Sequence, residues 1–337
     1  MLSEIDWKSA LLTKKTVFIL FGLLVITQII PAFIFSLEPG PSSVKERVNQ
    51  RSEQEEARQV TGYQMTATLI ETTKTLLDKK GGYITNDVLP PFIFMDDMPS
   101  WEFGALVQIR DLARTLRNDM SRSQTQSIEN TNLAEAEPLL NFNNNSWLLP
   151  ATEGEYEKAI DHLEIYLKEL TQTNQENTQF YARADNLREW LSIIQKRLGS
   201  LSQRLSASVG QTRVNTDLAG DTSAKQATQS SSDISVKTEW MEIDNVFYEA
   251  RGSVWALSQF LQAAEIDFKD VLEDKNALIS LRQITRELDA VQSNIWSPLV
   301  LNGSGFGLVA NYSLVLASYI SRANAAVIDL QNLLEQG

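Results

Sequence analysis

An uninterrupted apolar run near the start of the chain, residues 16–37, constrains the fold more than any other feature of the sequence. It contains 22 residues without a charge, TVFILFGLLVITQIIPAFIFSL, with Lys14 and Lys15 before it and Glu38 after it. A helix of this length would extend about 33 Å at about 1.5 Å per residue, and the hydrocarbon core of a bilayer is roughly 30 Å thick. The run therefore predicts one transmembrane helix.

Two other interpretations of this run compete with a permanent anchor. A cleavable signal peptide normally has a shorter apolar region followed by an A-x-A-like site, and residues 16–37 have neither feature. An amphipathic core helix would carry polar residues at regular intervals of three or four, and the run has no such pattern. We therefore favour an uncleaved single-pass anchor, with a signal peptide as the alternative.

The charges before the run predict its orientation. Lys8, Lys14 and Lys15 precede it, and short segments with an excess of Lys and Arg remain in the cytoplasm. Residues 1–15 are thus predicted to be a cytoplasmic tail, residues 16–37 the transmembrane anchor, and everything after residue 38 the exported part.

Charge and residue usage exclude several classes of function. The chain has 43 Asp and Glu against 30 Lys and Arg, a formal net charge of −13. Because a phosphate backbone repels so acidic a protein, we predict no nucleic-acid partner. The chain has no Cys and one His, His162, which excludes disulfides, thiolate sites and multi-histidine metal sites. We predict no metal site and no cofactor.

The exported part has the periodicity of packed helices. Apolar residues recur at steps of three and four in several segments, most regularly from Phe180 to Leu205, and no convincing strand-like alternation occurs. We therefore predict an all-α protein, in which an N-terminal transmembrane helix is followed by an elongated antiparallel helical bundle. The helices expected near residues 156–170 and 180–205 should pack against each other, and residues 44–59 should form a solvated stalk.

Breaks in the periodicity divide the exported part. Residues 38–210 are predicted to be a helical region with two loops rich in Pro and aromatic residues. Residues 211–236 contain nine Ser or Thr among 26 residues and no aromatic residue. Such a segment buries too little surface to offset its ordering entropy, which predicts a disordered linker or a long exposed loop. Residues 237–337 are predicted to be a three-helix C-terminal region. Thr152 and Glu155 have the spacing of a capping box at a helix start.

The two loops, residues 82–100 and 138–150, carry large apolar groups where loops normally expose polar ones. Two interpretations remain open. The loops either fold back over the ends of the bundle, or they form an exposed patch for a partner protein or the bilayer surface. The residues of this candidate interaction patch are Phe92, Phe94, Met95, Met98, Phe142, Trp147 and Leu148.

Acidic residues near the first loop are the best candidates for catalysis. Asp96, Asp97 and Glu102 lie close in sequence, and paired carboxylates can hydrolyse glycosidic bonds. Helix capping and turn chemistry explain the same residues more simply, so we assign no catalytic residue. His162 has no H-E-x-x-H neighbour, and residues 303–307 lack the third glycine and the lysine of nucleotide loops, so neither indicates an active site.

Five stretches of the sequence resemble a bacterial family, domain of unknown function 2333. They are GGYITNDVLPP at residues 81–91, WEFG at 101–104, RDLAR at 110–114, NNSW at 144–147 and FYARADNL at 180–187. The resemblance extends over nearly the whole chain. It implies a Gram-negative envelope protein, but no activity and no site residues. Together with the orientation predicted from the charges before the run, it would place the anchor in the inner membrane and the body in the periplasm.

These observations favour a non-enzymatic scaffold or interaction module of the cell envelope, with an envelope protein as its partner. The alternative is a periplasmic glycan-acting enzyme that uses the loop carboxylates. Apolar residues that recur at steps of three and four form a stripe along one face of each helix. Such stripes can pair between chains as well as within one, so a homo-oligomer also agrees with the sequence.

Overall fold

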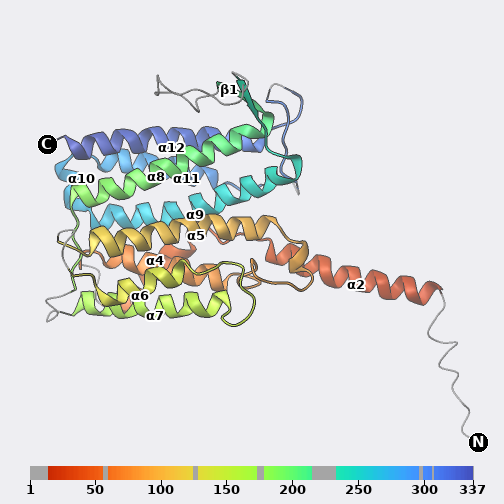
Figure 1. Ribbon diagram of the computed structural model, residues 1–337, viewed down its shortest axis with the longest axis horizontal. Coiled ribbons are helices and arrows are strands. Elements are labelled where there is room, and N and C mark those ends of the chain that lie inside the picture. Colours follow the sequence, from red (N-terminus) through yellow and green to blue (C-terminus); the bar gives the residue numbers. More distant parts are fainter. Residues whose placement is uncertain are drawn as a thin grey trace, which may run out of the picture.

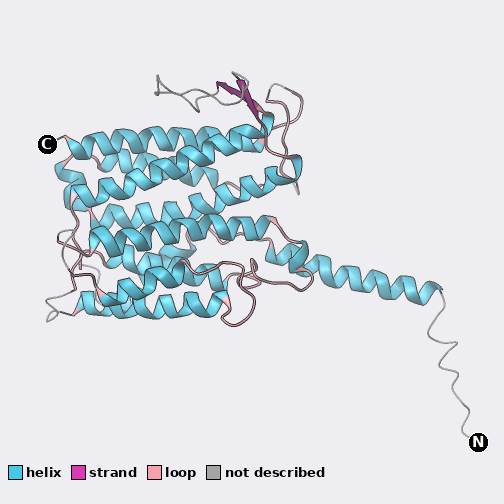
Figure 2. Cartoon of the chain, viewed as in Figure 1, coloured by secondary structure: helices cyan, strands magenta, loops and turns pink. Residues whose placement is uncertain are grey.

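The computed structural model describes residues 14–55, 60–123, 128–172, 178–214, 233–295, 299–305 and 307–336, and the described chain is mostly helical (Figure 2). Its α-helices are α2 (Lys14–Phe35), α3 (Ser43–Glu55), α4 (Tyr63–Asp78), α5 (Asp97–Thr115), α6 (Thr131–Leu140), α7 (Thr152–Thr171), α8 (Ala184–Ser206), α9 (Ile243–Asp267), α10 (Lys269–Asp274), α11 (Leu278–Val291) and α12 (Tyr312–Glu335). The shorter elements are η1 (Phe92–Phe94), η2 (Leu116–Met120), η3 (Ala207–Val209), η4 (Trp240–Glu242) and the strands β1 (Gln211–Val214) and β2 (Asp233–Val236). The predicted all-α class with an apolar N-terminal helix is confirmed.

Helix α2 projects away from the body, with its N-terminal end farthest from the other helices (Figure 1). Within the described residues it is the helix that is long and apolar enough to cross a membrane, and its apolar side chains are exposed. The predicted cytoplasmic tail, residues 1–15, lies outside the described residues except for the last two.

Helix α9 occupies the centre of the body. It packs against α4 and α5 on one side and against α11 on the other, and α12 packs against α8 and α11 (Figure 1). Most of its residues are buried around the whole helix, as is usual for a helix enclosed by others. The buried apolar residues of α3 to α12 form one continuous core.

Two glycines allow α5 and α9 to approach very closely. A Cβ atom added to Gly252 would lie 1.9 Å from the carbonyl oxygen of Trp101, and one added to Gly104 would lie 1.9 Å from that of Glu249. Beside this contact the rings of Trp101 and Trp255 pack with their centroids 4.9 Å apart. Both helices begin at the end of the body from which α2 projects (Figure 1), so this central pair is parallel, whereas the sequence predicted an antiparallel bundle.

The predicted pairing of the helices near residues 156–170 and 180–205 is wrong. Helix α7 packs against α4 and α6, α8 packs against α12, and α7 and α8 lie on opposite sides of the body (Figure 1). The apolar stripe of α8 is nevertheless buried as predicted, with Leu187, Leu191 and Leu198 fully inaccessible. A stripe identifies the face that is buried but not the helix that covers it.

Helix α3 is packed on the body and is not a solvated stalk. Val44, Val48 and Ser52 are buried at steps of four residues. Arg51 donates to Glu71 at 3.1 Å and also pairs with Glu164 of α7. Only two of these buried positions are apolar, so the periodic signal in the sequence was weak.

The predicted capping box at the start of α7 is also wrong. The N-cap residue is Ala151, which has no capping side chain. The buried hydroxyl of Thr152 instead donates to the carbonyl of Asn143 at 2.8 Å and accepts from the amide of Ser146 at 3.1 Å. Thr152 therefore fixes the preceding loop.

The segment predicted to be a disordered linker, residues 211–236, begins and ends with strands. β1 and β2 pair antiparallel, with Gln211 opposite Val236. Its central part, residues 215–232, lies outside the described residues.

The sequence also missed α6, because Pro138 lies inside that helix and proline normally ends one.

Candidate functional site

A buried ion pair joins the end of α2 to the centre of the body. The guanidinium of Arg251 on α9 donates from Nε and Nη2 to the two carboxylate oxygens of Glu38, both at 2.7 Å. Its Nη1 donates to the carbonyls of Val291 at 2.7 Å and Ser293 at 3.2 Å. We call this bidentate ion pair between Arg251 and Glu38 the fork. Because Arg251 is only 5% exposed, the fork holds Glu38, the residue that follows the apolar run, in a fixed position.

Further contacts fix the short connection between α2 and α3. The indole of Trp255 donates to the carbonyl of Gly40 at 3.3 Å, and the amide of Gln259 donates to that of Pro41 at 2.6 Å. Within α2, the ring of Phe35 stacks on that of Phe92 with centroids 5.4 Å apart. The apolar helix is therefore joined to the body by packed contacts, and we call this connection the joint.

A buried ion pair supports the first aromatic loop. The ammonium of Lys79 lies 2.6 Å from the carboxylate of Glu102, and the two side chains are 2% and 0% exposed. The same carboxylate accepts from the amides of Ile84 at 2.9 Å and Thr85 at 2.8 Å. Burial lowers the pKa of Lys79, although the charge of Glu102 opposes this shift. Glu102 thus holds the loop in place.

Hydrogen bonds connect the first loop to the second. The hydroxyl of Tyr83 donates to the carbonyl of Asn144 at 2.9 Å. The amide of Asn86 donates to the carbonyl of Ser146 at 3.0 Å and to the carboxylate of Glu153 at 2.7 Å. Burial is the main reason that the pKa of Tyr83 is raised, so its hydroxyl remains a donor. The two loops therefore form one structural unit beside the end of α2.

Neither interpretation of the predicted interaction patch holds for all seven residues. Met98 is buried, and Phe92, Met95 and Phe142 are partly buried against the core. Phe94, Trp147 and Leu148 are 79%, 48% and 61% exposed. Each loop thus covers the body with one set of apolar side chains and exposes another. Exposed apolar neighbours outside the predicted set are Leu89, Ile93 and Leu149.

The three carboxylates considered for catalysis differ in their contacts. Glu102 is committed to Lys79 and the loop amides, and Asp96 caps α5 by accepting from the amide of Asp97 at 3.1 Å. Burial, followed by the nearby charges of Asp244, Asp96 and Glu38, raises the pKa of Asp97 to about 7. Asp96 is thus the helix cap that the sequence suggests, whereas Glu102 holds the loop through Lys79 and two amides, a role that the sequence does not indicate.

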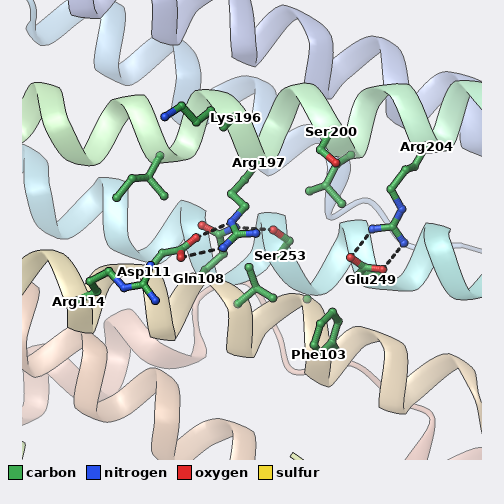
Figure 3. A pocket seen from close by; sticks show the side chains of 14 residues that line it. Phe103, Gln108, Asp111, Arg114, Lys196, Arg197, Ser200, Arg204, Glu249 and Ser253 are labelled. Carbon is green, nitrogen blue, oxygen red and sulfur yellow. Dashed lines mark hydrogen bonds and ion pairs between the residues drawn. The ribbon is translucent and has the colours of Figure 1, made fainter. Parts of the chain in front are cut away.

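A groove of about 440 Å³ lies between α5, α8 and α9 (Figure 3). Two ion pairs cross it: Arg197 donates to Asp111 at 2.7 and 3.0 Å, and Arg204 donates to Glu249 at 2.6 and 2.5 Å. On its floor the amide of Gln108 donates to the hydroxyl of Ser253 at 2.8 Å.

The groove is basic although the protein is acidic. Its lining contains the cations Arg114, Lys196, Arg197 and Arg204 and the acids Asp111 and Glu249. This excess of positive charge favours an anionic partner group. The sequence reasoning missed the groove. The seven-residue spacing of Arg197 and Arg204 places both on one face of α8, but their partners on α5 and α9 are distant in sequence.

The remaining sequence features have structural surroundings. His162 is partly buried, with Nδ1 3.3 Å from the side-chain oxygen of Asn132 on α6. Residues 303–305 and 307 lie in the connection between α11 and α12, where the amide of Gly303 donates to the carbonyl of Ala310 at 3.0 Å. Among the described residues, no group of three or more His, Cys, Asp or Glu is arranged to hold a metal ion.

These features define a class: a helical bundle with one N-terminal helix capable of crossing a membrane, joined to the bundle by a buried ion pair. The chain belongs to a bacterial family described as "Uncharacterized protein conserved in bacteria (DUF2333)", whose family model matches residues 6–337. The resemblance identified in the sequence is thereby confirmed. No curated protein and no solved structure matches the chain.

Proposed function

We propose that this protein is a non-enzymatic scaffold of the bacterial cell envelope, anchored in the inner membrane by α2, with its N-terminus in the cytoplasm and its body in the periplasm. The observation that carries the proposal is the buried fork between Arg251 and Glu38. A flexible tether is sufficient to keep an enzyme near a membrane. A packed joint also fixes the direction in which the body points, which is useful for presenting a surface to another protein.

The joint also supports an uncleaved anchor over a signal peptide. Phe35 lies inside the apolar run and packs on Phe92 of the folded body. Glu38, one residue after the run, satisfies a buried guanidinium. Removal of the run would take away the first contact, and cleavage after Glu38 would also leave Arg251 buried without its carboxylate, at a cost of several kcal/mol.

The basic groove is the surface at which we expect an envelope protein to dock, through an acidic segment. Four cations against two acids line it, so a carboxylate-rich helix or loop could contact Lys196 and Arg114 at its rim.

The glycan-acting alternative has less support, because Glu102 is fully buried in an ion pair and Asp96 serves as a helix cap.

Site-specific photo-crosslinking in intact cells tests the scaffold. A crosslinking amino acid at Ser200, in the groove, should give a discrete adduct with an envelope protein. The same group at Asp161, exposed on α7 on the other side of the body, should not. Charge reversal by Arg114→Glu with Lys196→Glu should reduce the adduct several-fold, whereas Lys158→Glu on α7 should leave it unchanged. Absence of any adduct specific to Ser200 would contradict docking in the groove.

Reporter fusions test the topology. A reporter active only in the cytoplasm, fused after Gly337, should give no signal, and a periplasmic reporter at the same place should be active. Signal from the cytoplasmic reporter would overturn the proposed orientation.

A further inference from the structure

Two segments at the end of the body from which α2 projects carry exposed apolar side chains (Figure 1). In the first loop, Leu89, Ile93 and Phe94 are 64%, 59% and 79% exposed. In η4, directly before α9, Trp240 and Met241 are 83% and 75% exposed. The two segments are about 150 residues apart in the chain, yet both lie at this end of the molecule (Figure 1).

The contacts of α2 determine the level of the first group relative to the apolar run. Phe92 stacks on Phe35, which belongs to the uncharged run itself. A Cβ atom added to Gly81 would lie 2.8 Å from the same Phe35 ring. Ile93 and Phe94 directly follow Phe92 in η1. The first loop therefore lies level with the last turn of the run, and not beyond its end.

The ion pair at the joint determines the level of the second group. Arg251 contacts Glu38, the residue after the run. From Arg251, α9 continues back to Ile243, which is about 12 Å at about 1.5 Å per residue, and this end of α9 points in the direction in which α2 projects (Figure 1). Trp240 and Met241 belong to η4, which directly precedes Ile243 at this end of α9. These two residues are therefore also level with the apolar run.

We propose that this end of the body rests on the bilayer, with Phe94 and Met241 entering the boundary between headgroups and acyl chains. The inference rests on the proposed anchoring by α2. Lipid that surrounds the last turns of α2 must meet side chains held at the same level by packed contacts. Aromatic and aliphatic groups at this depth lose contact with water, and Trp is favoured at the membrane interface.

The charges at this end agree with shallow docking driven by apolar burial. Glu239 and Glu242 flank Trp240 and are exposed, and Asp87 and Asp96 lie in the first loop. Carboxylates are costly in the acyl region and are repelled by anionic lipid. We therefore expect docking on a zwitterionic surface, with only weak dependence on salt.

Quenching of a fluorescent label by nitroxides attached to lipid, measured on the full chain in vesicles, tests this proposal. Because the chain contains no Cys, each variant can carry a single label without background. Single Cys variants at Phe94 and Met241 would carry an environment-sensitive bimane label in phosphatidylcholine vesicles, part of the lipid bearing a nitroxide on its acyl chain. The matched control is Ile279→Cys at the start of α11, which is 80% exposed at the opposite end of the body (Figure 1). Leu24→Cys, within α2, reports on the anchor itself.

We expect the Phe94 and Met241 labels to be quenched by the lipid nitroxide several-fold more than the Ile279 label, and to be shielded from iodide in the water. If Leu24 is quenched but the two labels respond as Ile279 does, docking is overturned while the anchor stands. Labels shielded from iodide without lipid quenching would mean that a second copy covers this end, which also overturns docking. An unquenched Leu24 label would overturn the anchoring itself.

Discussion

At the scale of single residues, Arg251 is the side chain on which the connection between α2 and the body depends. Arg251→Ala removes the fork to Glu38 and leaves that carboxylate and two backbone carbonyls without their donor. Breaking a buried ion pair typically costs about 3 to 5 kcal/mol, so we expect a loss of this size in the free energy of unfolding. Urea titration of the full chain in detergent, followed by circular dichroism, measures it.

A matched surface arginine provides the control for that change. Arg322 makes a comparable pair with Glu287 at 2.9 Å, but its side chain is 50% exposed. Exposed pairs contribute little, so Arg322→Ala should leave the urea midpoint almost unchanged. Equal losses at Arg251 and Arg322 would mean that the joint does not depend on burial of the fork.

Two acidic residues should make the stability of the body depend on pH. Burial raises the pKa of Asp267 to about 7 against the lowering effect of amides at the start of α4, among them Met65 at 2.7 Å. Burial, with nearby acids, raises that of Asp97 to about 7. Unfolded Asp has a pKa of about 3.9. Between about pH 4 and 7 the folded protein holds protons that the unfolded chain has released, so its free energy of unfolding falls as pH rises.

The free energy of unfolding should fall by at most about 1.4 kcal/mol per pH unit for each carboxyl. The fall should be smaller for Asp97, because solvent partly screens its charge. Urea unfolding at pH 5 and at pH 7.5 measures the difference. Asp267→Asn keeps an oxygen that can accept from Met65, and it should flatten the slope. Asp185→Asn, at a carboxylate that is 85% exposed, controls for the lost charge. A stability that rises between these pH values would contradict the prediction.

The residue scale also separates what sequence can reveal from what it cannot. Glu38 was recognised as the charge that ends the apolar run, and the run itself predicted α2. Its partner Arg251 lies 213 residues away, and a pairing across that distance leaves no periodic signal. Glu102 was considered as a possible acid, but only its contact with Lys79 reveals its structural role.

At the scale of helices, periodicity predicted the buried faces well and the partners poorly. The stripe of α8 is buried as expected, yet it faces α12 and not α7. Many helices can offer a complementary stripe, so the choice depends on connections and on the whole core. Pro138 concealed α6, and the two-stranded pair was missed because four-residue strands contain too few positions for a clear alternation.

The close contact of α5 and α9 gives a prediction at this scale. In a helix, Gly→Ala normally stabilises by about 0.5 to 1 kcal/mol. At Gly252 the new methyl would lie 1.9 Å from the backbone oxygen of Trp101, so Gly252→Ala should instead destabilise, by about 1 to 3 kcal/mol or more, since the helices must separate. Thermal unfolding followed by circular dichroism measures the change.

Gly199 in α8 is the matched control, because a Cβ there would make only an ordinary contact of 3.6 Å with Asn324. Gly199→Ala should raise the melting temperature or leave it unchanged. If Gly252→Ala were stabilising as well, the backbones of α5 and α9 would have to be farther apart than described.

At the scale of the whole molecule, the central position of α9 makes the two predicted halves interdependent. Residues 237–337 were predicted to be a three-helix region, but the longest of these helices, α9, packs against α4 and α5 of the first half as well as against α11. Its fully buried side chains include Trp255 and Phe260, and Trp101 of the first half contacts Trp255. Composition marked the boundary at residues 211–236, but a boundary in sequence need not divide a core.

Residues 237–337 should consequently fail to fold alone. Without the first half, α9 would expose the face that meets α5, and a fragment that loses this area has too little burial to offset its ordering entropy. We expect the isolated fragment to exchange its α9 amides rapidly and to melt without a cooperative transition. Co-expression with residues 1–210 should restore slow exchange, because the two pieces together rebuild the single core. A fragment that melts cooperatively on its own, near the temperature of the full chain, would instead establish two independent domains.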